Sequence, residues 1–342
     1  MQIRKIVLDQ LERAYSTGYV RVDGKPMAII ASEAVDGPCY SYHGEQFEHK
    51  TVVWEHGGGT MSIVEIPNSN GEFLATQRFF PGFNAATSKI VHGKYQNGAW
   101  VIEDFMTLPY VHRFDILQAA DGLYFVGATL CTSKTEREDW SDPGKIYVGK
   151  LTGVYNEPIA LTVIKEGLTR NHGYCRGMWN GLESGFVTTD EGVFVVTPPN
   201  AGSDWTVEQL MSHRVSDVAL CDINQDGTDE LVTIEPFHGA EFYIYQKTAA
   251  GYEKIYSYPD PIEFAHVVWG GKLRGKETII GGVRRQRAEL FYIQKEGNEL
   301  ITTIIDEGKG PANVAVIHEE HRDIIITANN TVHEAALYIV ED

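Results

Sequence analysis

Glu235-Pro-Phe-His-Gly-Ala-Glu-Phe-Tyr-Ile-Tyr245 is the segment that decides the fold, because two later segments repeat its pattern. The repeats are Arg284-Arg-Gln-Arg-Ala-Glu-Leu-Phe-Tyr-Ile293 and Asn330-Thr-Val-His-Glu-Ala-Ala-Leu-Tyr-Ile339. The copies lie about 45 to 50 residues apart, which is the length of one four-stranded blade of a β-propeller. Each copy also follows another strand-like run, such as Asp229–Ile234 before the first. The repeat therefore predicts consecutive four-stranded antiparallel sheets.

Extending this template along the 342 residues predicts seven blades, with six or eight as alternatives. The last blade, residues 312–342, ends after three strands, whereas Gln2–Leu11 is strand-like and has no sheet of its own. Pairing the two would hide both sheet edges. We therefore predict one all-β propeller domain over residues 1–342, closed by the N-terminal strand 2–11. Only Trp205–Ser212 looks briefly helical.

Composition excludes several classes of partner. The net charge of −18 and the lack of a basic stretch argue against nucleic acid and against an anionic membrane surface. No apolar run is long enough to span a bilayer, and charges interrupt Met1–Asp9 before a signal peptide could form. The four cysteines are scattered and show no CxxC spacing, which indicates reduced thiols. We expect a cytoplasmic protein.

Histidines recur at equivalent steps of the repeat. The loops before first strands and the turns between second and third strands open on the same face of a propeller, and they supply His56, His112, His172, His213, His238, His266, Arg287 and His333. Converging imidazoles suit a divalent metal or an acid–base pair working near neutrality. The alternative for each histidine is a structural role, in which it bonds main-chain carbonyl groups. The group as a whole predicts a functional mouth, with His112, His172 and His266 as the preferred ligands of Mn, Zn or Mg.

Asp222-Ile-Asn-Gln-Asp-Gly-Thr-Asp-Glu230 is a separate signal. Oxygens of Asp222, Asn224, Asp226 and Asp229 around a glycine turn suit a structural calcium ion, although Thr233 stands where an EF-hand would have glutamate. A bare Asx-rich turn explains the same residues. Because the turn joins a first to a second strand, we expect it on the face opposite the histidines.

Two further features belong to the expected mouth. Gly281-Gly-Val-Arg-Arg-Gln-Arg287 brings arginines beside the histidines, where they would bind an anionic group or pair with nearby acids. The long charged loop Cys131–Gly144 contains a tryptophan and is typical of a lid or binding loop.

The Asp-rich turn followed by a strand resembles the FG-GAP, or VCBS, type of propeller repeat. Tyr110-Val-His-Arg-Phe-Asp115 and Glu235-Pro-Phe-His-Gly239 resemble segments in the propeller part of aldos-2-ulose (anhydrofructose) dehydratases. A looser likeness exists to propeller polysaccharide lyases. These resemblances imply β-elimination on a carbohydrate.

The resulting hypothesis is a carbohydrate lyase that acts on a keto-sugar or a uronic-acid-containing saccharide. Elimination needs a base, an acid and an electrophile that holds the enolate. We assign His238 as base, His333 or Tyr110 as acid, and the metal assisted by Arg287 as electrophile. The alternatives are a non-catalytic carbohydrate- or protein-binding propeller and a metal-dependent hydrolase.

Overall fold

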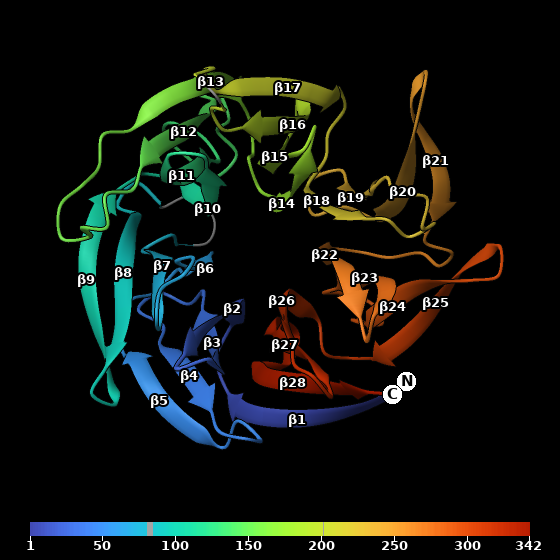
Figure 1. Ribbon diagram of the computed structural model, residues 1–342, viewed down its shortest axis with the longest axis horizontal. Coiled ribbons are helices and arrows are strands. Elements are labelled where there is room, and N and C mark those ends of the chain that lie inside the picture. Colours follow the sequence, from blue (N-terminus) through green and yellow to red (C-terminus); the bar gives the residue numbers. More distant parts are fainter. Residues whose placement is uncertain (81–84, 201) are drawn as a thin grey trace. The chain divides into compact units, whose positions relative to one another are not determined.

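The computed structural model describes residues 1–80, 85–200 and 202–342 and shows an all-β, seven-bladed β-propeller with four antiparallel strands per blade (Figure 1). The predicted fold class is confirmed. Besides strands, the described residues contain one 3-10 turn, η1 (Asn330–Val332). In this part of the chain, no helix has the length and apolar character needed to cross a bilayer.

Blades I to IV form one compact unit, residues 16–213. Blade I comprises β2 (Ala14–Val22), β3 (Lys25–Ser32), β4 (Cys39–His43) and β5 (His49–Trp54). Blade II comprises β6 (Ile63–Glu65), β7 (Glu72–Gln77), β8 (Lys89–Gln96) and β9 (Ala99–Thr107). Blade III comprises β10 (Val111–Ala119), β11 (Gly122–Thr129), β12 (Gly144–Lys150) and β13 (Thr162–Leu168). Blade IV comprises β14 (Tyr174–Trp179), β15 (Leu182–Thr189), β16 (Gly192–Thr197) and β17 (Thr206–Met211).

Blades V to VII form the second unit, residues 1–15 with 214–342. Blade V comprises β18 (Asp217–Cys221), β19 (Glu230–Glu235), β20 (Glu241–Thr248) and β21 (Gly251–Ser257). Blade VI comprises β22 (Ala265–Leu273), β23 (Lys276–Val283), β24 (Leu290–Glu296) and β25 (Glu299–Asp306). Blade VII comprises β26 (Pro311–His318), β27 (Asp323–Asn329), β28 (Glu334–Glu341) and β1 (Gln2–Gln10). The organisation of the chain as one domain stays a prediction.

The N-terminal strand completes the last blade, as the sequence predicts. β1 runs antiparallel to β28, from Gln2 opposite Glu341 to Gln10 opposite Glu334. β28 is buried from Glu334 to Val340, so β1 covers an edge that is otherwise apolar. The three repeated segments end in β20, β24 and β28, the third strands of their blades.

The second strand of each blade is buried on both faces, and successive residues face opposite neighbours. Ile279 of β23 packs in the cluster shared by blades V and VI, whereas Ile280 packs in the cluster shared by blades VI and VII. Phe73 and Leu74 of β7 divide in the same way between blades I and III. The alternation follows from the period of two along a strand. It explains why these strands are almost continuously apolar, unlike half-exposed strands.

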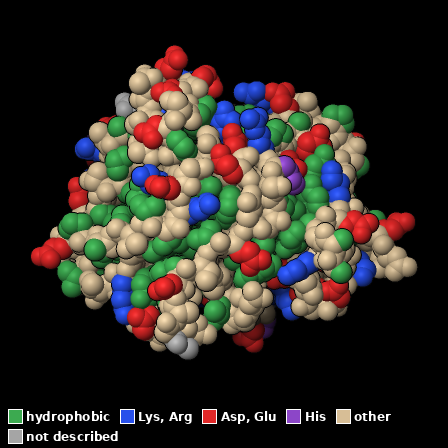
Figure 2. Space-filling view, turned by 90° about the horizontal axis from the view of Figure 1, so that it is seen from above, with side chains coloured by type: hydrophobic (Ala, Val, Ile, Leu, Met, Phe, Trp, Pro, Cys, Tyr) green, Lys and Arg blue, Asp and Glu red, His purple; other side chains and the backbone are tan. Residues whose placement is uncertain are grey.

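The outer strands are the polar part of each blade. Exposed and half-buried residues alternate over 99–103 of β9, which shows that only one face of this part of the strand packs on the blade core. On the face of the molecule that Figure 2 shows, acidic and basic side chains are interspersed, with hydrophobic ones between them. Mixed charge of this kind favours solubility.

Trp205–Ser212 is a strand, so the helical expectation is wrong. β17 pairs with β16, but the register shifts between Val193 and Phe194, so that Leu210 is an extra residue on the outer strand. The bulge changes the phase of the apolar alternation, and the resulting spacing resembles that of a short helix.

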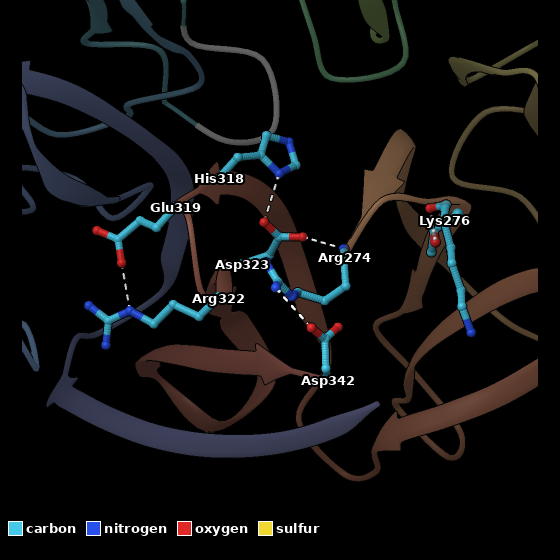
Figure 3. A network of polar contacts seen from close by, with 8 residues as sticks. Arg274, Lys276, His318, Glu319, Arg322, Asp323 and Asp342 are labelled. Atoms are coloured by element: carbon cyan, nitrogen blue, oxygen red, sulfur yellow. Dashed lines mark hydrogen bonds and ion pairs between the residues drawn. The ribbon is translucent and has the colours of Figure 1, made fainter.

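Hydrogen bonds join neighbouring blades at the hairpins between first and second strands. In blades VI and VII, Arg274 donates its main-chain N–H to the carboxylate of Asp323, which also contacts Nδ1 of His318 at 3.0 Å (Figure 3). Asp23 donates to Asn70 at 2.7 Å between blades I and II, and Gln118 donates to Glu183 at 2.8 Å between blades III and IV. An acceptor on one blade thus satisfies a hairpin N–H on the preceding blade.

We expect Asp323→Ala to lower the free energy of unfolding by about 1–3 kcal/mol, because it leaves the Arg274 N–H without its acceptor in a buried site. Asp342→Asn is the control, since this carboxylate contacts Nη2 of Arg274 at 3.1 Å but is 80% exposed. Its loss should cost less than about 1 kcal/mol. Chemical denaturation of both variants measures the difference, and equal effects would contradict the proposed role of Asp323.

Candidate functional site

A left-handed main-chain turn precedes most of the seven first strands. Tyr110, Arg170 and Phe264 have φ angles of 59°, 56° and 64°, in the left-handed region that non-glycine residues rarely adopt. The same step is occupied by Gly59 at 55° and by Gly310 at 59°. The repeat therefore imposes this turn even where the residue is bulky.

A β-bulge follows the turn and redirects the side chain that the sequence singled out. The register of β10 with β11 shifts between Val111 and Arg113, which makes His112 the extra residue. The register of β22 with β23 shifts around His266 in the same way, and that of β26 with β27 shifts around Ala312. Bulges often reorient a side chain beside a functional or structural contact.

The two bulge histidines bind the main chain of the next blade. His112 is 3% exposed, and its Nδ1 lies 3.0 Å from the carbonyl oxygen of His172. His266 is also 3% exposed, with Nδ1 2.6 Å from the carbonyl oxygen of Ala312. A carbonyl only accepts, so Nδ1–H is the donor in both cases. We call these contacts the blade latches; Ser62 makes the same link by donating Oγ–H to the carbonyl of His112 at 3.0 Å.

Several of the predicted histidines stack on or lie beside other aromatic rings of their own unit. In blades III and IV, His112 stacks on His172 with ring centroids 4.5 Å apart. In blades V and VI, His238 lies 5.3 Å from His266 and is stacked between two phenylalanine rings. His56 and His213 are exposed.

The residues predicted as acid and electrophile have structural partners. Tyr110 is buried, burial raises the pKa of its phenol, and its carbonyl accepts the N–H of Leu130 at 3.0 Å. Arg287 pairs with Asp260 at 2.8 Å and with Glu289 at 2.7 Å, as the acid-pairing alternative predicts.

His333 holds the N-terminal segment against blade VII. Its Nδ1 accepts the N–H of Arg13 at 3.0 Å, and its carbonyl accepts the N–H of Leu11 at 2.6 Å. Both bonds lie just after β1, so this histidine is placed to fix the chain where it leaves the last blade.

A group of aromatic and basic side chains, half-buried or exposed, lies at the loop ends of blades V and VI. We call it the Phe264 cluster; it comprises Phe237, His238, Phe264, Arg284 and Arg285. His238 lies between the rings of Phe237 and Phe264, at centroid distances of 4.1 and 4.4 Å. The guanidinium carbons of Arg284 and Arg285 lie 5.0 and 4.9 Å from the centroid of Phe264. The repeat pattern predicted the arginines and His238 as residues of the mouth, but not the two phenylalanines.

The loop Cys131–Gly144 is internally ordered. Asp139 accepts from the main-chain N–H and the hydroxyl of Thr135, at 3.0 and 2.8 Å, and from the same two groups of Ser141, at 3.0 and 2.6 Å. These bonds, those from Ser141 first, hold the pKa of Asp139 well below its usual range. Trp140 lies between Lys134 and Arg170.

The Asp-rich turn joins β18 to β19, at the end of blade V opposite His238, as the sequence predicts. Asp222 accepts the N–H groups of Asp226 and Gly227 at 2.9 and 3.1 Å, and Asn224 accepts that of Asp226 at 2.8 Å. Asp229 lies beside this network, where burial and the charge of Asp222 raise its pKa. An Asx-rich turn therefore accounts for much of the motif, and the calcium ion stays a prediction.

Glu230 follows this turn and is 1% exposed. Burial raises its pKa to about 7, and the charges of Asp226 and Asp222 add to the increase. The N–H of Asn224 opposes this effect. Oε1 of Glu230 accepts a second hydrogen bond, from Nδ2 of Asn224 at 2.7 Å.

The fold is similar to that of known propellers. No family model matches the chain, and no curated protein matches it. The β-propeller domain of Cps50 (Swd1) from Myceliophteria thermophila matches with a TM-score of 0.62 at 11% identity, over 97% of this chain and 98% of that chain. Sqt1 from Saccharomyces cerevisiae matches with a TM-score of 0.55 at 9% identity, over 99% and 98%. At these identities the likeness shows the fold alone.

The expectation of a carbohydrate lyase is wrong. The two similar solved structures, Sqt1 and the Cps50 (Swd1) propeller domain, agree better with the alternative of a non-catalytic, protein-binding propeller than with a lyase that acts on a sugar. The blade latches supply a physical reason: His112 and His266 recur in register because each joins its blade to the next. The roles assigned to His238, His333, Tyr110 and Arg287 depended on the elimination reaction and fall with it. The divalent metal ion at His112, His172 and His266 stays a prediction.

We expect His266→Ala to lower the free energy of unfolding by about 1–3 kcal/mol, because the Ala312 carbonyl loses its donor in a buried site. His266→Asn should restore much of the loss, since its amide can donate from nearly the same place. His49→Ala, with a side chain 64% exposed, should have little effect. Thermal and denaturant unfolding measure all three; an Ala variant as stable as the wild type would rule out the latch.

We expect Glu230→Gln to reduce the pH dependence of stability. The folded state keeps a proton on Glu230 up to about pH 7, whereas the unfolded chain releases it near its ordinary value. The contribution of this group is thus present at low pH and lost as pH rises through 7. Between pH 5 and 8 in EDTA, the wild type should lose about 2 kcal/mol more than the variant. Glu253→Gln, exposed on β21, should leave the profile unchanged.

Proposed function

We propose that this chain is a non-catalytic, protein-binding propeller, and that the Phe264 cluster contacts its partner. The observation that carries the proposal is the cluster itself, in which half-buried aromatic rings lie under two arginines. Aromatic residues and arginine are the side chains that dominate binding energy at protein interfaces.

The cluster is ordered before any partner binds. The carbonyl of Phe264 accepts the N–H of Arg284 at 2.9 Å, and Arg285 pairs with Glu263 at 2.6 Å. His238 is fixed by its own N–H, which donates to Oγ of Ser216 at 3.1 Å. Side chains that are already fixed lose little conformational freedom on association, so more of the contact energy appears as affinity.

The charge of the cluster favours a partner with an acidic group beside an apolar side chain. Arg285 is 60% exposed and Glu263 is 50% exposed, so the ion pair between them is weak. A carboxylate of the partner can therefore replace Glu263 as the group that pairs with Arg285. The phenylalanine edges next to it offer apolar contact area.

Two finer points belong to the same proposal. We keep the FG-GAP/VCBS type as a proposal for blade V, supported by the Asp-rich turn that joins β18 to β19. We also keep the cytoplasm as the compartment, supported by the four cysteines, which are present as thiols.

Arg285→Glu tests the proposal, with Lys272→Glu as the matched control. Both residues belong to blade VI and are exposed. Arg285 pairs with Glu263, and Lys272 pairs with Glu277. Lys272, however, lies near the hairpin of β22 and β23, at the other end of the blade.

Proteins that the wild type retains from lysate of its source cells are identified, purified and titrated against all three forms. We expect Arg285→Glu to raise the dissociation constant at least about tenfold, which corresponds to about 1.4 kcal/mol of binding free energy. Lys272→Glu should change it little. Equal affinities for the two variants would place the interface elsewhere.

A further inference from the structure

The outer strand of blade VI differs from the other outer strands in its charge pattern. β25 is the edge of its sheet, and its interior, Leu300-Ile-Thr-Thr-Ile-Ile305, contains no charged residue, proline or glycine. The other outer strands all have a charge within them, at Arg4, Lys50, Glu103, Lys165, Glu208 and Lys254. Charged residues on edge strands prevent unwanted pairing with other chains.

The edge is regular over most of its length and partly exposed. β25 pairs with β24 without interruption from Glu299 opposite Glu296 to Ile304 opposite Phe291, and the register then shifts at Ile305. Thr303 is exposed and Ile304 is 37% exposed. A strand with these properties presents unpaired main-chain groups to an added strand.

Side chains of β25 are anchored on both neighbouring blades. Oγ1 of Thr302 lies 2.5 Å from the hydroxyl of Tyr256 in blade V, and Leu300 packs on the cluster shared with that blade. Ile305 packs on the cluster shared with blade VII. The edge is therefore held in an extended conformation, and an added strand would have to order mainly itself.

The flanking charges decide between a second copy and a different partner. An antiparallel pair of two β25 strands centred between Thr302 and Thr303 would bring Glu299 near Asp306 at both ends, even with the register shift at Ile305. Like charges close together across a sheet destabilise it. Lys5 and Tyr338 offset part of the Asp306 charge, at 3.2 and 2.8 Å. Glu299, at the start of β25, is exposed, so its charge remains at that end of the edge.

We propose that the edge of β25 is a docking site for an extended segment of a partner protein, with an uncharged β-branched centre and lysine or arginine at its flanks. The segment adds to blade VI as a fifth strand, its main chain pairs with the free edge, and its cationic flanks lie near Glu299 and Asp306. This site goes beyond the proposed function and does not depend on the Phe264 cluster.

The probe is a synthetic peptide with a Thr-Val-Thr-Val-Thr centre and two lysines on each side. Its affinity is measured by fluorescence anisotropy, and amide hydrogen exchange of the full chain locates the contact. We expect the bound peptide to slow amide exchange over residues 299–304 and to leave exchange over β17 unchanged. A glutamate-flanked peptide should bind at least about tenfold more weakly, and a peptide with N-methylated central residues should not bind, because it lacks main-chain donors.

Thr303→Lys places a charge in the middle of the edge, and Thr206→Lys places the same charge on the outer strand of blade IV. We expect Thr303→Lys to weaken peptide binding at least about tenfold, with Thr206→Lys and Arg285→Glu unchanged. The last variant separates this site from the Phe264 cluster.

Three results would overturn the proposal: no protection of 299–304 at about 1 mM peptide, equal binding by Thr303→Lys and the wild type, or a wild-type dimer that Thr303→Lys dissociates. The dimer would assign the edge to self-association. The exchange data on the wild type decide the matter even if Thr303→Lys fails to fold.

Discussion

Burial of the second strand on both faces is the constraint on which the blades depend. Ile279 and Ile280 are neighbours in the chain but belong to the cores on opposite sides of blade VI. A one-residue slip of this strand would exchange the two sets and disrupt both cores at once. The packing therefore fixes the register of the central strands and leaves the strand ends and the outer edges as the places where blades differ.

Polar contacts between blades are concentrated at those ends. At one end, His112 and His266 bond the main chain of the following blade; at the other, Asp323 and Glu183 accept hairpin N–H groups from the preceding blade. Hydrophobic contact between two sheets is non-directional, whereas these bonds have a defined geometry. The blade latches thus add directional contacts between the blades that they join.

The sequence was sufficient for the fold because the third strands, as in Glu235–Tyr245, repeat an aromatic and β-branched pattern that each blade needs. It was insufficient for the histidines because imidazoles at the same step of two blades, as at His112 and His266, suit a metal site and a latch to a main-chain carbonyl equally well. The difference lies in the bulges around His112 and His266, which are properties of strand pairing and leave no mark in composition. The bulge at Leu210 hid β17 for the same reason.

Phe264 combines a main-chain conformation set by the repeat with a side chain in the proposed binding cluster. Its left-handed φ belongs to the repeat, and glycine fills the same step at Gly59 and Gly310. A phenylalanine there costs conformational energy that the fold alone does not require, since a glycine would adopt the turn more easily. What the bulky residue adds is a ring stacked on His238 and covered by two arginines. Under the proposed function, this ring at a half-buried position contributes contact area for the partner. The same argument applies to the uncharged edge of β25. Both the left-handed Phe264 and this edge are unfavourable for an isolated blade, and both become favourable when another chain covers them.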